Sequence, residues 1–137
     1  MDEASQRMFW TTMGNPKQND GAIYSVQLDG SDVKSMVPTG KVHAPKHCTI
    51  DQKAHKLYFS DREGLRVMRV NLDGSELETL VQNGEWQTEG FEDETKWCVC
   101  VAVSQMLGKF FWTQKGASKG SAGRIFSALL DMPRGTD

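Results

Sequence analysis

Two histidines and a lysine lie close enough together in the chain to share a site: His43, Lys46 and His47. Because an imidazole titrates near neutral pH, His47 could act as a general acid or base, or donate a hydrogen bond to a ligand carbonyl. Lys46 could hold an anionic or carbonyl-bearing ligand. Two histidines are too few for a metal site, so no metal is expected. The alternative is that both histidines are strand-edge residues with no role in binding.

A second candidate group consists of Trp86 and Lys96 in an acidic loop, residues 83–96, and of Trp97, which follows it. Aromatic side chains on a loop can line a small-molecule pocket or anchor a protein partner. Lys96 precedes Trp97 as Lys46 precedes the second histidine, so both lysines are expected near the same opening. The alternative is a solvated acidic loop that one buried tryptophan holds in place.

These candidates lie between the copies of a repeated unit, which must position them. Each copy contains two aromatic residues followed by a hydroxyl residue, at 9–11, 58–60 and 111–113. The period is 53 residues between Ile50 and Val103, and 49 residues between Phe9 and Tyr58. Short apolar strands and turns alternate within each copy. Four antiparallel strands in a repeat of about 50 residues are typical of one blade of a β-propeller.

The core segments of the three copies read Phe-Trp-Thr-Thr, Tyr-Phe-Ser-Asp and Phe-Trp-Thr-Gln. Together with the Leu-Asp-Gly turns at 28–30 and 72–74, they resemble the YWTD repeats, also called the class B repeats of the low-density lipoprotein receptor. Two features depart from the family pattern. Only Asp61 keeps the acid of the core motif, and the third copy reads Leu130-Asp131-Met132 where the family has its turn.

The resemblance implies a six-bladed, TolB-like propeller, similar to intracellular propellers of filamentous fungi. It also extends to certain fungal natural-product enzymes, including hetero-Diels–Alder cyclases. We therefore expect an all-β chain, a β-propeller fragment of about three four-stranded antiparallel blades with almost no helix, roughly half of a ring. Blade 1 should span about 1–45 and lack its inner strand, blade 2 about 46–96, and blade 3 about 97–137 and lack its outer strand.

A start inside a strand rather than a linker indicates a piece of a longer propeller. The expected partner is therefore either the missing half of the propeller or a second copy of the chain, which would make the protein oligomeric.

Five loops are expected to emerge on one face of the propeller, and they are longer than the turns on the other face. They span residues 13–21, 38–46, 62–65, 83–96 and 115–123. Long loops on a compact scaffold tend to carry function. Trp10 and Trp112 occupy matching repeat positions and are expected in the core. The cysteines, Cys48, Cys98 and Cys100, are expected to be buried free thiols.

The bulk composition excludes several classes of function. A net charge of −2 gives no footprint for nucleic acid. No run of apolar residues is long enough to span a membrane. A polar start and unpaired thiols favour a cytoplasmic protein. No cofactor motif stands out, so no cofactor is expected.

Two functions remain open. The first is a small-molecule-binding propeller with its site on the long-loop face, for which cyclase or isomerase chemistry is one option. The alternative is a non-catalytic propeller that binds other proteins. An apolar, concave loop face with Lys46 and His47 pointing inward would favour the first, whereas a flat, charged face would favour the second.

Overall fold

The computed structural model describes residues 1–15, 17–85, 87, 93–117 and 119–131. In these residues the chain forms strands joined by turns and loops, and its one helical segment is a 3-10 turn, η2 (Glu94–Lys96). The strands, in chain order, are β1 (Arg7–Thr12), β2 (Gly21–Gln27), β3 (Lys34–Val42), β4 (Pro45–Asp51), β5 (Lys56–Asp61), β6 (Arg66–Asn71), β7 (Glu78–Gln82), β8 (Cys98–Ser104), β9 (Lys109–Gln114) and β10 (Arg124–Leu129).

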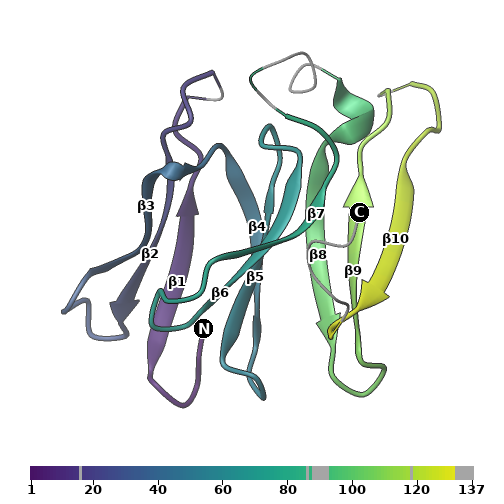
Figure 1. The fold of residues 1–137 in the computed structure, drawn as a ribbon. Helices are drawn as coiled ribbons and strands as arrows, with labels where there is room; N and C mark the ends of the chain where they lie inside the picture. The colour runs from purple at the N-terminus through teal and green to yellow at the C-terminus, as the bar shows by residue number, and fades with distance from the viewer. Residues whose placement is uncertain (16, 86, 88–92, 118, 132–137) are drawn as a thin grey trace.

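These strands form three antiparallel sheets that stand side by side (Figure 1). We call β1-β2-β3 the first sheet, β4-β5-β6-β7 the middle sheet and β8-β9-β10 the third sheet. The middle sheet lies between the other two, and each sheet is a meander of consecutive strands. The protein is therefore all-β and has the architecture of part of a β-propeller, with three consecutive blades.

The core consists of two apolar layers, one on each side of the middle sheet. Consecutive residues of a strand point to opposite faces, so Phe59 packs toward the first sheet and Tyr58 toward the third. Both side chains are at most 1% exposed. Aromatic residues at neighbouring positions of β5 thus hold the middle sheet between its two neighbours.

The Asp-Gly-Ser turns form as the sequence predicts. In the turn after β2, the carboxylate of Asp29 accepts a hydrogen bond from the backbone N–H of Ser31 at 2.9 Å. In the turn after β6, the carboxylate of Asp73 accepts one from Ser75 at the same distance. Gly30 has a φ of 86°, in the left-handed region that glycine enters without steric cost.

The prediction of a loop over 38–46 is wrong. β3 continues to Val42 and β4 begins at Pro45, so only two residues connect the first sheet to the middle sheet. Val37 pairs with Ile23 and Val42 pairs with Gly21, so residues 38–41 form an exposed bulge within the strand. The Pro and Gly of this bulge read as a loop in the sequence because both residues interrupt regular strands.

The prediction that Trp10 lies in the core is also wrong, since its side chain is 38% exposed. Trp10 stacks on Tyr24, with ring centroids 5.4 Å apart, on the face of the first sheet that points away from the middle sheet. Phe59 occupies the same repeat position and is fully buried. Trp112, also at this position, is half-buried and packs against the core between the middle and third sheets.

All three cysteines are free thiols, but only Cys98 is buried; Cys48 is half-buried and Cys100 is exposed. The prediction of burial therefore fails for Cys100. Cys98 pairs with Gln114 and Val101 with Trp112, so β8 carries one extra residue, a bulge, between them. A bulge interrupts the alternation that would otherwise keep two residues of equal parity on one face.

We expect the three thiols to react with Ellman's reagent at different rates in the native protein. Cys100 should react first. Burial raises the pKa of Cys48, and burial, together with the charge of Asp61, raises the pKa of Cys98 to about 12, so the latter should react only after unfolding. Stopped-flow absorbance at pH 8 would measure this, and Cys100→Ser should remove the fast phase. A fast phase of two or more thiols would contradict the structure.

Candidate functional site

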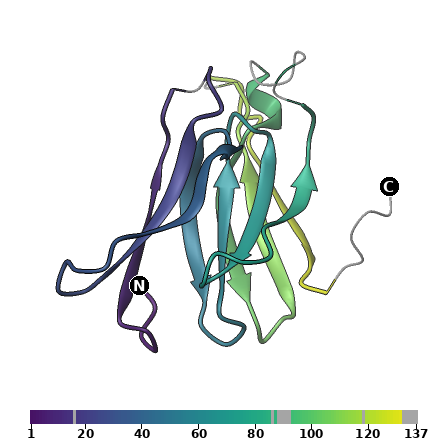
Figure 2. The ribbon, with the colours of Figure 1, turned by 60° about the vertical axis from the view of Figure 1, so that its left-hand side comes forward.

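The long connections of the sheets gather at one end of the molecule (Figure 1, Figure 2). The described residues at this end are 13–15, 17–20, 62–65, 83–85, 93–97, 115–117 and 119–123. We call this end the long-loop face. The opposite end, the short-turn face, carries the turns 28–33, 52–55, 72–77 and 105–108. The sequence predicted this segregation, except that 38–46 contributes a two-residue connection instead of a loop.

The long-loop face has a cluster of cations around Trp97. The guanidinium carbon of Arg62 lies 4.6 Å from the centre of the indole ring, and the ammonium of Lys115 lies 5.1 Å from it. The backbone N–H of Lys115 also donates to the carbonyl of Trp97 at 3.1 Å. Cation–π attraction orders both cations over the half-buried indole, so the ring fixes two positive charges near the start of an inner strand.

A third cation, Lys46, lies nearby at the start of β4. Its side chain is half-buried and its ammonium donates to the sulfur of Met13, a weak acceptor. None of the ion pairs among the described residues includes Lys46. Burial, and secondly the positive charge of Arg62, lower the pKa of this lysine. Its charged form is therefore disfavoured where it stands, and an anion beside it would be stabilising.

Glu63 adds a buried carboxylate to the cluster. Its Oε1 accepts two hydrogen bonds from the guanidinium of Arg62, one of them at 2.8 Å, and the two side chains form an ion pair. Its side chain is only 4% exposed. The second oxygen, Oε2, is buried and has no hydrogen-bond partner among the described residues. A buried acceptor in this state is costly unless a donor reaches it.

Asp61 holds the cluster's scaffold together. Its fully buried carboxylate accepts hydrogen bonds from the backbone N–H groups of His43, at 3.0 Å, and Ala44, at 2.6 Å. It also forms an ion pair with Arg66 at 2.5 Å. A Cβ added at Gly64 would lie 2.2 Å from Asp61 Oδ2, so this glycine leaves room for the carboxylate. These bonds fasten the end of β5 to the connection that leads into Lys46.

The predicted site residues have different positions. His43 is fully buried, and its Nδ1 accepts a hydrogen bond from the backbone N–H of Asn19 at 3.1 Å. His47 is exposed on β4, and its Nδ1 lies 3.5 Å from the backbone nitrogen of Val101. Lys96 ends the 3-10 turn η2, and its carbonyl accepts from the Asn83 side chain at 3.2 Å.

Of the six predicted residues, Lys46 and Trp97 therefore belong to the cluster. Trp86 lies outside the described residues.

Sequence reasoning assigned no site role to Arg62, Glu63 and Lys115. A repeat signal could have found the two cations, because Asp61 and Gln114 end equivalent strands and the next residue in each copy is a cation. In the first copy the residue at this position is Met13, which contacts Lys46. One repeat position thus supplies side chains to the cluster from all three sheets.

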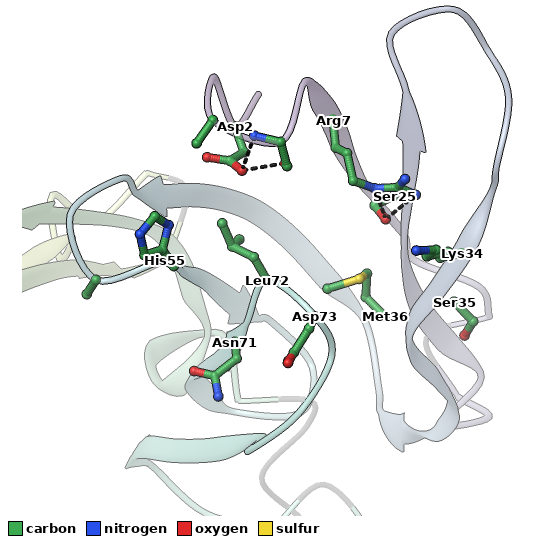
Figure 3. A pocket seen from close by; sticks show the side chains of 13 residues that line it. Asp2, Arg7, Ser25, Lys34, Ser35, Met36, His55, Asn71, Leu72 and Asp73 are labelled. Atoms are coloured by element: carbon green, nitrogen blue, oxygen red, sulfur yellow. Dashed lines mark hydrogen bonds between the residues drawn. The ribbon is translucent and has the colours of Figure 1, made fainter.

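A cavity of about 860 Å³ lies elsewhere, between the first and middle sheets at the short-turn face. The predicted site residues that the structure describes do not line it. Figure 3 shows Met36 and Leu72 lining it and Arg7 directed at Ser25. The guanidinium of Arg7 is already neutralised by Asp32 at 2.9 Å. Asp2 also lines the cavity, and its buried Oδ1 has no hydrogen-bond partner among the described residues.

The comparisons with known proteins found relatives in fungi. The chain is 52% identical over 129 residues to the "3-hydroxyacyl-CoA dehydrogenase-like protein LAM1" of Cochliobolus heterostrophus, covering 93% of this chain and 27% of that protein. It is 44% identical over 129 residues to the "Low-density lipoprotein receptor-related protein 1" of Pyricularia oryzae, covering 91% of this chain and 42% of that protein. The chain thus spans less than half the length of these relatives, and no family model matches it.

Among solved structures, the chain is similar to propellers. A chain of the nidogen/laminin complex matches with a TM-score of 0.72 and 14% identity, over 96% of this chain and 43% of that one. A putative TolB from Agrobacterium tumefaciens matches with a TM-score of 0.62 and 15% identity, over 95% and 44% respectively. At these identities the likeness shows the fold alone. Helices long and apolar enough to cross a bilayer are absent from the described residues.

Proposed function

We propose that this chain is the ligand-binding part of a β-propeller and that its long-loop face binds a small anionic molecule. The observation that carries the proposal is that Arg62 and Lys115 lie over the Trp97 ring, with Lys46 close enough to Arg62 for that charge to lower its pKa. Arg62 and Lys115 each have a carboxylate partner, Glu63 and Glu94 respectively. Lys46, which forms no ion pair with the described residues, is therefore the group that an incoming carboxylate or phosphate would neutralise.

The proposal includes a second requirement for the ligand: the side chains that cover the buried Oε2 of Glu63 move aside on binding, and a donor group of the ligand reaches this oxygen. An acceptor without a partner is satisfied by a hydroxyl or amino group, so the best ligand would carry an acid and a donor a few atoms apart. A hydroxy acid has this combination. If the site is catalytic, as for a cyclase or an isomerase, Glu63 would serve as the base and Lys46 as the acid.

A non-catalytic interaction with another protein is the second candidate. It is supported by the charged character of the long-loop face, where a smaller cavity of about 380 Å³ is lined by Lys41, Arg66 and Glu85 among other polar residues. A partner with an acidic patch would use the same cations. Binding of a small hydroxy acid to the isolated chain would separate the two candidates, because a flat protein-binding surface holds small molecules weakly.

Malate and succinate test the proposal, since they differ by one hydroxyl group. We expect malate to bind more tightly than succinate, and Lys46→Met to weaken the binding of both by about ten- to a hundredfold, the worth of a charge-assisted hydrogen bond. Glu63→Gln should reduce the preference for malate. Isothermal titration calorimetry would measure the affinities, with tryptophan fluorescence as a second readout.

Lys53→Met is the matched control, because Lys53 is exposed in the turn 52–55 on the short-turn face. It should bind both acids as the unchanged chain does. Equal affinities in Lys46→Met and the unchanged chain would refute the assignment of Lys46. Absence of binding of both acids at millimolar concentration would refute a small-molecule site and leave the protein-binding candidate.

A further inference from the structure

The two interfaces between sheets are built from equivalent positions. On the side that faces the first sheet, the middle sheet has four apolar residues that are at most 3% exposed: Leu57, Phe59, Met68 and Val70. On the side that faces the third sheet, it presents Tyr58 and Val67, which are at most 1% exposed. Each sheet thus has an incoming face, toward the preceding sheet, and an outgoing face, toward the following one.

The first sheet keeps an apolar incoming face although no described sheet covers it. Its strand register, Met8 with Val26 and Trp10 with Tyr24, matches that of Leu57 with Val70 and Phe59 with Met68 in the middle sheet. The equivalents in the middle sheet are buried, whereas Met8 is 47% exposed. The residue types of an interface are therefore present on a surface that the chain alone leaves open.

The outgoing face of the third sheet is also apolar, and no described sheet covers it. Ile125 pairs with Thr113 as Val67 pairs with Ser60 and as Ile23 pairs with Thr11. Ile23 and Val67 are fully buried, but Ile125 is 77% exposed. On the same face, Leu129 is 51% exposed. Since the equivalent positions of the other two sheets lie in interfaces, this exposed apolar face is a candidate interaction surface.

We propose that these two faces bind each other in a second copy of the chain, head to tail. The incoming face of one copy, with Trp10, would pack on the outgoing face of the other, with Ile125. The chain already contains two interfaces in which an outgoing face packs on an incoming face. The proposed contact between copies would use the same packing. Applied in both directions, it closes two copies into a ring of six sheets around a two-fold axis.

The direction of pairing is the specific content of the proposal. Both internal interfaces join an outgoing face to an incoming one, with the long loops of all sheets at the same end. Pairing two incoming faces would cover only those two faces and leave the outgoing face of each copy exposed, with Ile125 and Leu129. Head-to-tail pairing keeps the long-loop faces together.

Analytical ultracentrifugation of three samples tests this. The unchanged chain should sediment with twice the mass of one chain, 15.3 kDa. Trp10→Glu and Ile125→Glu should each be monomeric. In a ring of two identical variant copies, both interfaces would contain the substituted residue. Mixed in equal amounts, the two variants should form a heterodimer, since one intact incoming face then meets one intact outgoing face.

Met106→Glu is the control, because Met106 is 93% exposed in the turn 105–108, outside both faces. It should remain dimeric, and circular dichroism should show that all variants keep the fold. A monomeric unchanged chain at micromolar concentration would overturn the proposal. So would variants that still dimerise alone, which would indicate like-with-like pairing, or folded variants that stay monomeric when mixed.

Discussion

Asp61→Asn is expected to destabilise the protein by about 3–5 kcal/mol, the usual cost of breaking a buried ion pair. The carboxylate is fully buried and accepts hydrogen bonds from the backbone N–H groups of His43 and Ala44 and from the guanidinium of Arg66. An amide has one oxygen instead of two and would point its NH₂ at another donor. It would also leave the charge of Arg66 without its partner.

Urea unfolding followed by circular dichroism would measure this loss. Asp29→Asn is the matched control, because Asp29 is an exposed carboxylate whose oxygen accepts from Ser31, and the amide oxygen of asparagine can do the same. The control should leave the unfolding midpoint unchanged. If Asp61→Asn unfolds at the same urea concentration as the control, the buried carboxylate does not hold the β5 end to the β3–β4 connection.

Phe59→Ala is expected to destabilise the protein by about 3–5 kcal/mol, since it removes an aromatic ring from a close-packed core. Phe59 is fully buried between the first and middle sheets, in the cluster that contains Ile23, Val37 and Met68. Neighbouring side chains on two separate sheets cannot collapse into the space without moving the sheets. The cavity would therefore persist.

Trp10→Ala is the matched comparison for Phe59→Ala, because Trp10 occupies the same repeat position on the open incoming face. In the monomer, Trp10→Ala should lower the free energy of unfolding much less than Phe59→Ala does, since Trp10 is already 38% exposed. Differential scanning calorimetry at low protein concentration would give both values. Equal destabilisation by the two substitutions would mean that another surface already covers Trp10 in solution, or that the repeat register is wrong.

The strand order and the three-sheet architecture were predictable because short sequence patterns identify each copy of the repeat. Aromatic pairs at Phe9 and Tyr58 and the glycine of each Asp-Gly-Ser turn act within a few residues, so a sequence shows them directly. The loop prediction failed at 38–41 because a bulge with Pro38 and Gly40 looks like a loop until its strand partner is known. The bulge is recognised only from the pairing of Val42 with Gly21, a residue in another part of the chain.

The candidate site was predictable in part. Lys46 and Trp97 were chosen for their types and for their places at strand starts, and both belong to the cation cluster. Arg62 and Glu63 received no site role from the sequence, because nothing local shows that this turn folds over an indole 35 residues further along the chain. His43 looked accessible in a supposed loop, whereas the bond network of Asp61 encloses its backbone.

The sequence by itself determined the alternation of faces in the regular strands and the position of the Asp-Gly-Ser turns, since both depend on backbone geometry and on neighbours within a few positions. Only the tertiary structure decided which faces are covered. Trp10, Phe59 and Trp112 share one repeat position, yet they range from exposed to fully buried. Burial depends on whether another sheet stands opposite, and a single repeat does not contain that information.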